Sequence, residues 1–385
     1  MKEEPTFRDN QGVMTEPHSL TTDMRLRVHK AISESQGWLP FDQFMALALY
    51  EPGLGYYANQ QPKFGNMPQS GSDFVTAPEL SPMFGATLAQ QVAEALAATG
   101  TDEVWEFGAG SGALAQQLLT ELKRLGCPLK RYNIMDLSST LKARQQAKLA
   151  EFGEQVQWLS QWPDSLQGVV VGNEVLDAMP VKLLHRIQGQ WHERGVVQAD
   201  TEQGLAWQDK PTELRPPMSP AGEHDYLTEI QPQAEAFVAS LADRLLASEK
   251  GGAAFFLDYG FPESEYFHPE RHMGTVMCHQ AHKADPNPLA SVGLKDITAH
   301  VNFTGIALAG QDAGLQVLGY TSQARFLLNL GLAEKMADSP LPERAQAMKL
   351  ISEHEMGELF KVIGFATHDH WQAQGFAAGD RSHKL

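Results

Sequence analysis

The chain has 385 residues and is 42% hydrophobic, enough to bury a large core. Its formal net charge of −17 disfavours nucleic acid as a partner and would attract a basic segment of another protein. No apolar stretch is long enough to cross a membrane, and the N-terminal residues resemble neither a signal nor a transit peptide, so a cytoplasmic location is expected. The two cysteines are far apart and the histidines lack metal-ligand spacing, so neither a disulfide nor a metal site is expected.

The first hundred residues do not show the pattern of a parallel sheet. Residues 1–20 are polar and predicted to be disordered, and residues 21–100 are predicted to form an N-terminal helical cap with a lid loop. Apolar spacing predicts helices around residues 26–32 and 41–50, and Pro82 favours a helix start that continues to Gly100. Residues 53–72, rich in Gly, Gln, Asn and Pro, form the predicted lid.

The stretch from Val104 to Leu114 has the pattern of a buried strand that turns through glycines into a helix. Gly108, Gly110 and Gly112 permit positive φ angles, and a helix that opens at Ser111 would direct unpaired N–H groups at a ligand. The spacing fits neither a dinucleotide fingerprint nor a phosphate-binding loop. Glu106, two residues before the first glycine, suits the cationic amino and sulfonium groups of S-adenosylmethionine. The alternative is a glycine-rich turn without a ligand.

Two further strands end on polar residues. The strand at residues 132–136 ends on Asp136, which is predicted to hold the ribose hydroxyls of the cofactor, with a helix N-cap as the alternative. The apolar run 168–172 stops at Asn173. Because ligands of open α/β sheets bind beyond the carboxyl ends of the strands, residues 173–180 are predicted to line the site.

After residue 180 the sequence predicts an insertion, and then further strands and helices of the sheet domain. Short alternating segments predict a β-rich insertion at about residues 182–230, followed by a helix over 232–248 and a buried strand over 253–258. Strands near 299–303 and 315–320 and helices over 322–329 and 345–363 complete the prediction. The predicted fold class is therefore α/β, with a doubly covered sheet in a catalytic domain over residues 101–385.

Six motifs, at residues 55–57, 73–79, 106–112, 173–180, 258–260 and 296–303, follow one another in an order that resembles the MidA family of S-adenosylmethionine-dependent methyltransferases. This family includes the mitochondrial complex I assembly factor that methylates an arginine of a complex I subunit. The resemblance implies a Rossmann-like class I fold, S-adenosylmethionine as cofactor, and a protein arginine as acceptor, with a respiratory complex subunit as one candidate. The chain departs from the family at Ser72, at Asp136, where a longer Glu is expected, and at Asn302, where an Asp is expected.

Methyl transfer from a sulfonium is an in-line displacement, so residues that align the acceptor matter most. Glu174 and Asp177, three residues apart, would share a face on the first turn of a helix and hold a guanidinium, or would merely complement the dipole of a helix capped by Asn173. His300 is the candidate neutral base, with a structural role as the alternative. Tyr259 is a candidate for the acceptor pocket or for the core.

Three other residues, two acids and one amide, complete the predicted site. Asp73 and Glu79 flank Pro78 in a segment expected to fold over the cofactor, where Asp73 would face the substrate and Glu79 the cofactor, or one of them would be a buried cap. Asn173 is assigned to cofactor binding together with Glu106, Asp136 and the three glycines. No metal ion is predicted in this site.

Two other functions are open at this stage. One is a methyltransferase for an oxygen or nitrogen atom of a small molecule, because the fold does not fix the acceptor. The other is an assembly chaperone that retains the cofactor pocket and acts by binding a partner. An intact glycine turn beside Glu174 and Asp177 favours catalysis. The oligomeric state is left open, with a homodimer as one option.

Overall fold

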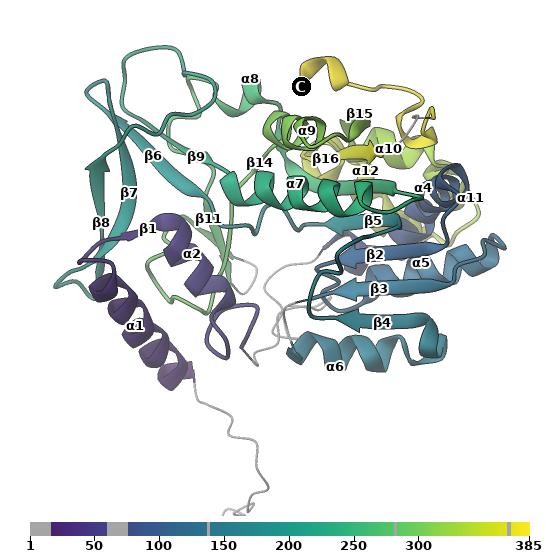
Figure 1. Cartoon of the computed structure of the whole chain (residues 1–385), viewed down its shortest axis with the longest axis horizontal. Coiled ribbons are helices and arrows are strands. Elements are labelled where there is room, and N and C mark those ends of the chain that lie inside the picture. The colour runs from purple at the N-terminus through teal and green to yellow at the C-terminus, as the bar shows by residue number, and fades with distance from the viewer. Residues whose placement is uncertain (1–16, 60–75, 137–138, 281–282, 368–370) are drawn as a thin grey trace, which may run out of the picture.

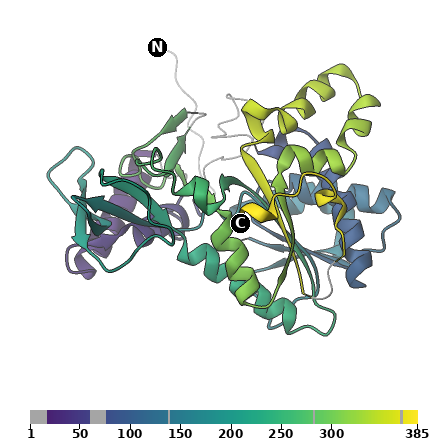
Figure 2. The same ribbon diagram turned by 90° about the horizontal axis from the view of Figure 1, so that it is seen from above.

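The computed structural model describes residues 17–59, 76–136, 139–280, 283–367 and 371–385. A large α/β part and a smaller, β-rich lobe lie side by side (Figures 1 and 2). The smaller lobe comprises residues 17–59, 181–230, 268–280 and 283–299. The candidate site lies where these two parts meet.

The large part is built on one twisted sheet. Its strands are β2 (Glu103–Phe107), β3 (Arg131–Met135), β4 (Val156–Leu159), β5 (Gly168–Asn173), β10 (Gly252–Phe261), β15 (Gln316–Ser322) and β16 (Phe360–Ala366). The order is β15-β16-β10-β5-β2-β3-β4, with β14 (Val301–Asn302) beside the end of β10. Strands β4, β3, β2, β5 and β10 are parallel, and β16 is antiparallel to both of its neighbours. The carboxyl ends of the parallel strands therefore meet at one edge.

Helices cover both faces of this sheet, as predicted. One face packs against α4 (Met83–Thr99), α5 (Ala113–Arg124), α10 (Gln323–Asn329), α11 (Leu332–Ala337) and α12 (Leu341–Ile351). The other face packs against α7 (Pro232–Leu246) and α9 (Phe303–Asp312). Helix α6 (Ser139–Lys148) follows β3, and the short α3 (Ala77–Leu80) and α8 (Glu263–Tyr266) lie outside these layers. This doubly covered sheet confirms the predicted α/β class.

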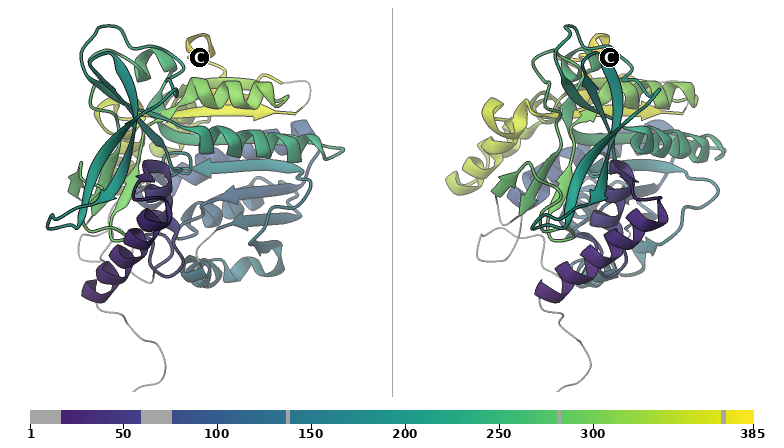
Figure 3. Two further views of the ribbon diagram at one scale, coloured as in Figure 1. Left: turned by 60° about the vertical axis from the view of Figure 1, so that its left-hand side comes forward. Right: turned by 90° about the vertical axis from the view of Figure 1, so that its left-hand side faces the viewer.

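The smaller lobe has its own core. Its elements are α1 (Pro17–Glu34), β1 (Leu39–Pro40), α2 (Phe41–Tyr50), β6 (Lys182–Ile187), β7 (Gln190–Gln198), β8 (Leu205–Pro211), β9 (Tyr226–Ile230), β11 (Met277–Gln280), β12 (Lys283–Asp285) and β13 (Asp296–Thr298). Strand β1 pairs with β7, and Phe41, Val196 and Ile297 share one apolar cluster. The N-terminal helices and the insertion thus pack together, as Figure 3 shows from two sides. Helix α1 begins at Pro17, within the segment predicted to be disordered.

Two predictions for the C-terminal part are wrong. The helix predicted over residues 345–363 ends at Ile351, and Phe360–Ala366 forms β16 in the middle of the sheet. All seven residues of β16 are buried, which suits a strand covered on both faces. The strand predicted over residues 299–303 shrinks to Val301–Asn302, because α9 begins at Phe303. The Asn302 side chain caps α9 by accepting a bond from the Gly305 N–H.

The described part of the chain contains no helix that is both long and apolar enough to span a bilayer.

Candidate functional site

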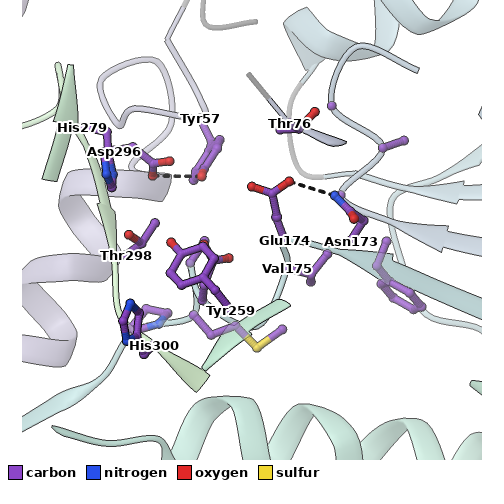
Figure 4. Close-up of a pocket in the computed structure, with 18 of the residues that line it drawn as sticks. Tyr57, Thr76, Asn173, Glu174, Val175, Tyr259, His279, Asp296, Thr298 and His300 are labelled. Carbon is purple, nitrogen blue, oxygen red and sulfur yellow. Dashed lines mark hydrogen bonds between the residues drawn. The ribbon is translucent and has the colours of Figure 1, made fainter. Parts of the chain in front are cut away.

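A cavity of about 1170 Å³ opens beyond the carboxyl ends of β2, β3, β5 and β10. The smaller lobe supplies the opposite wall, including Tyr57 and Asp296 (Figure 4), and its Tyr50 also lines the cavity. Predicted site residues that line this cavity are Glu79, Glu106, Gly108, Gly110, Asp136, Asn173, Glu174, Asp177, Tyr259 and His300. Gly112 is the N-cap residue of α5, and Asp73 lies outside the described residues.

The glycine turn connects β2 to α5. Gly108, Gly110 and Gly112 have φ angles of 65°, 53° and 80°, in the left-handed region that glycine adopts at little cost. A Cβ atom at Gly108 would lie 3.2 Å from Val175 Cγ2, so a side chain there would crowd the turn that follows β5. Helix α5 begins at Ala113 rather than at Ser111. At Gly108 and Gly110 the turn therefore presents backbone without side chains to the cavity.

Ser111 ties the glycine turn to the segment in front of it. Its hydroxyl donates a hydrogen bond to Glu79 Oε1, and Lys148 Nζ lies 3.9 Å from the same oxygen. Glu79 therefore serves as an anchor that holds α3 over the turn. This contact is between two side chains and caps no helix, and Glu79 is half-buried on the cavity wall.

Glu106 lies on β2 with 2% of its surface exposed. The Tyr132 hydroxyl donates to Glu106 Oε2 at 2.6 Å. Burial raises the pKa of Glu106 to about 8, although the Tyr132 bond opposes this shift. A cation that enters beside Glu106 would favour the charged carboxylate.

Gln145 connects the end of β3 to the glycine turn. Its side-chain amide donates to Asp136 Oδ2 at 2.8 Å and to the Gly110 carbonyl oxygen at 2.9 Å. The Trp158 indole N–H donates to Gln145 Oε1 at 3.0 Å, which fixes the orientation of the amide. Asp136 is thus held beside the glycines by a residue on α6 that the sequence prediction did not single out.

The prediction that Glu174 and Asp177 lie on the first turn of a helix is wrong. Residues 174–180 form turns, and Glu174 has a φ angle of 54°, an uncommon conformation for a residue with a side chain. Asn173 is no helix cap, because no helix follows it, and its side-chain amide donates to Glu174 Oε1 at 3.0 Å. Glu174 and Asp177 nevertheless both line the cavity.

Asp258 fixes this turn. Its Oδ2 atom accepts the backbone N–H groups of Val175, Leu176 and Asp177 at 3.1, 2.9 and 3.3 Å. Asp258 is 1% exposed, and it sits on β10 beside the end of β5. The backbone N–H groups of this turn are therefore satisfied by a buried carboxylate on the neighbouring strand, and no helix is formed. Asp258 is not among the residues that line the cavity, and it holds in place the turn that carries Asp177.

Buried acids dominate this part of the cavity. Burial, together with the charge of the nearby Asp177, raises the pKa of Glu174 to about 8. Burial also raises the pKa of Asp177 to about 6, against a hydrogen bond from Tyr259 that lowers it. Asp177 is 4% exposed, and within the described structure its Oδ1 atom has no hydrogen-bond partner. Buried polar atoms are normally paired, so this oxygen is available to a ligand.

Tyr259 and His300 form the floor of the cavity. Their rings meet edge to face at 5.2 Å between centroids, and the His300 ring also packs against Phe261 at 5.1 Å. Burial lowers the pKa of His300 to about 4, with Arg271 and Lys361 adding to the effect, so the imidazole is neutral at physiological pH. His300 Nδ1 is buried and has no bond to any described residue.

Sequence reasoning missed the residues that the smaller lobe brings to the cavity. The Tyr57 hydroxyl donates to Asp296 Oδ1 at 2.9 Å, and the Tyr50 hydroxyl donates to the Ala178 carbonyl oxygen at 2.8 Å. The two tyrosine rings stack at 5.6 Å. Asp296 and Tyr57 both lie in motifs of the family resemblance, so the motifs pointed to these positions without revealing that they pair.

No group of three or more His, Cys, Asp and Glu side chains in the described ranges is arranged to hold a metal ion.

The strand order with its one antiparallel strand, the glycine turn after β2 and the acid after β3 define a class I S-adenosylmethionine-dependent methyltransferase fold. A family model for S-adenosyl-L-methionine-dependent methyltransferases matches residues 87–321, which is more than half of the chain. The protein belongs to this family.

Solved structures and curated relatives agree with this assignment. A COG1565 superfamily member from Burkholderia thailandensis, crystallised with S-adenosyl-homocysteine, is 44% identical, with a TM-score of 0.90 over 98% of this chain and 100% of that one. The protein arginine methyltransferase NDUFAF7, mitochondrial, of Danio rerio is 28% identical over 83% of this chain and 82% of its own length. The Caenorhabditis elegans homologue of NDUFAF7 is 25% identical over 82% of this chain and 78% of its own length.

Proposed function

We propose that this protein transfers a methyl group from S-adenosylmethionine to an arginine side chain of another protein. The observation that carries the proposal is the meeting, in one cavity, of the glycine turn with two acids suited to a guanidinium, Glu174 and Asp177. The names of the NDUFAF7 relatives support arginine as the acceptor. The formal charge of −17 supports a basic protein segment, rather than nucleic acid, as the partner.

The residues around the glycine turn fit the cofactor. In this proposal Glu106 faces its cationic methionine portion, the backbone at Gly108, Gly110 and Gly112 accommodates it closely, and Asp136 accepts the ribose hydroxyls. Asn173 lies between this region and the acids and would contact the cofactor from β5. Bound S-adenosylmethionine supplies an electrophilic methyl group on a sulfonium.

Glu174 and Asp177 act on the acceptor in this proposal. Two carboxylates can hold a planar guanidinium through paired hydrogen bonds and orient one nitrogen toward the methyl group. Their raised pKa values make them better proton acceptors than ordinary carboxylates, so one of them takes the proton that the methylated nitrogen loses. Tyr259 orients Asp177 through its hydrogen bond. Neutral His300 would serve as a relay for that proton.

The test is transfer of labelled methyl from S-adenosylmethionine to arginine-containing proteins by the wild type, Glu174→Gln and Asp177→Asn. Each variant removes a charge and keeps the shape, so we expect a loss of roughly 2–4 kcal/mol of transition-state stabilisation, about 30- to 1000-fold in rate. Cofactor affinity should be unchanged. Asp243→Asn, on the exposed surface of α7, is the matched control.

Each alternative function predicts a different outcome. Equal labelling by the wild type and both variants would remove the two acids from the mechanism. Labelling of small metabolites alone would favour a small-molecule methyltransferase. Assembly of a partner complex that survives both substitutions would favour a chaperone. The cytoplasmic location, a respiratory complex subunit as substrate and a homodimer as the assembly are further parts of the proposal, to be tested by fractionation, substrate identification and sedimentation.

A further inference from the structure

Asp296 brings a carboxylate to the cavity from outside the methyltransferase sheet. It opens β13 in the smaller lobe, is 2% exposed, and accepts the hydroxyl hydrogen of Tyr57 at 2.9 Å. Figure 4 shows the Glu174 carboxylate pointing toward the Tyr57–Asp296 pair from the other side of the cavity. The two walls come from segments far apart in the sequence, since Tyr57 follows α2 and Glu174 follows β5.

The carboxylates on the two walls are close enough to interact through their charges. The charge of Asp296 contributes to the raised pKa of Glu174, and the charges of Asp296 and Asp177 both contribute to the raised pKa of Tyr57. Carboxylates that repel one another in a buried cavity are stabilised when a cation enters between them. The buried Oδ1 atom of Asp177 has no hydrogen-bond partner among the described residues, which is a second, independent indication that a hydrogen-bond donor belongs here.

We propose that Asp296, positioned by Tyr57, forms the second wall of the acceptor pocket, so that the guanidinium is held from both sides and arginine is selected over lysine. This inference rests on the proposed function. A guanidinium presents five N–H donors around a planar fork, and Glu174 and Asp177 face only part of it. A lysine ammonium is a compact point charge with three donors and cannot span the two walls.

Tyr57 is a positioning residue in this scheme. Its hydroxyl bonds to Asp296 while its ring stacks on Tyr50, which is in turn tied to the Ala178 carbonyl beside Asp177. The tyrosine pair therefore sets the distance between the wall built by the smaller lobe and the turn that follows β5. Tyr56 offers a matched control, because it is 2% exposed, packs edge to face on Tyr57 and does not line the cavity.

The experiment measures methyl transfer to an arginine-containing protein that the wild type labels, and to the same protein with that arginine changed to lysine. We expect Asp296→Asn to raise KM for the arginine substrate about tenfold or more, as for loss of a hydrogen bond to a charged group, with a smaller change in kcat and unchanged cofactor affinity. Tyr57→Phe should raise KM about threefold or more for the weaker loss of positioning. Tyr56→Phe should match the wild type.

A pH profile separates this role from a merely structural one. Removing the charge of Asp296 relieves the repulsion that raises the pKa of Glu174, so the acid limb of kcat/KM should move to lower pH in Asp296→Asn even as KM rises. The preference for arginine over lysine should also narrow. Loss of packing alone would produce neither change.

Failure of this inference and failure of the proposed function give different results. A wild type that labels no arginine contradicts the proposed function. If the wild type labels arginine, and Asp296→Asn has the KM and the acid limb of the wild type, the proposed role of Asp296 is overturned and the proposed function stands. If Asp296→Asn does not fold, as judged by circular dichroism, Tyr57→Phe decides, because a wild-type KM in that variant also overturns it.

Discussion

The substitution Glu106→Gln should stabilise the folded protein at alkaline pH while weakening cofactor binding. Gln keeps an oxygen that accepts the Tyr132 hydroxyl and removes the buried charge. The pKa of Glu106 is raised from an ordinary value of 4.5 to about 8. Between these two values the folded protein retains a proton that the unfolded chain has lost, so the wild type loses stability as the pH rises through this window.

The size of the effect follows from the same shift. One pKa unit corresponds to about 1.4 kcal/mol, so the full shift would cost roughly 5 kcal/mol by pH 8, and relaxation around the charge brings the expected cost to about 2–5 kcal/mol. The variant avoids this cost. Its free energy of unfolding relative to the wild type should therefore be near zero at pH 5 and should rise by that amount at pH 8.5.

Urea unfolding at pH 5, 6.5 and 8.5 measures this difference, and calorimetry with S-adenosylmethionine measures affinity. We expect the variant to bind about tenfold or more weakly, because a bond to a charged group is lost. Glu103→Gln, on the same strand but outside the cavity lining, should bind as the wild type does. A stability difference that stays constant from pH 5 to 8.5 would refute the reasoning from burial.

Three further predictions concern cofactor, acceptor and metal. Gly110→Asp should abolish binding of S-adenosylmethionine in calorimetry while the circular dichroism spectrum stays that of the wild type, because Asp tolerates the left-handed φ of 53° but fills space that the ligand needs; binding at wild-type affinity would show that the turn is no cofactor site. The kcat/KM for the acceptor should rise with pH between about 6 and 8, since the pKa values of Asp177 and Glu174 are about 6 and about 8 and both must be charged to hold a cation; a flat profile would contradict their role. Treatment with a chelator should leave methyl transfer unchanged, because the displacement needs no Lewis acid; activity lost with the chelator and restored by zinc would overturn this.

Local patterns in the sequence were sufficient to predict the strand, the glycine turn and the acid that lie at one end of the cavity. The stretch from Glu106 to Gly112 and the acid at Asp136 carry their meaning within a few residues, because a strand, a turn and a helix follow one another directly. The helix predicted over residues 345–363 failed for the opposite reason. A short apolar run such as Phe360–Ala366 fits a buried strand or a buried helix equally well, and only its place between β10 and β15 decides.

The arrangement of Glu174, Asp177 and Asp296 depends on contacts that no local pattern contains. Asp258 accepts bonds from N–H groups that lie 81 to 83 residues away, and Tyr57 pairs with Asp296 over a separation of 239 residues. Sequence reasoning identified Glu174 and Asp177 correctly as neighbours but assigned them to a helix. The contribution of Asp296 to the repulsion among these carboxylates arises only when the smaller lobe meets the sheet.

The core of the smaller lobe also constrains how the chain folds during synthesis. Phe41 and Phe44 emerge early, yet part of the apolar surface that covers them comes from Ile297 and Ala299. Contacts of such large sequence separation form slowly. The apolar surface of the N-terminal helices therefore stays partly exposed while the ribosome synthesises the chain through β10 and on to residues 297–299. Nascent chains stalled before residue 296 should therefore bind chaperones through residues 41–49 and be cut there by proteases. After release of the full chain, chaperone binding and proteolysis at these residues should both stop.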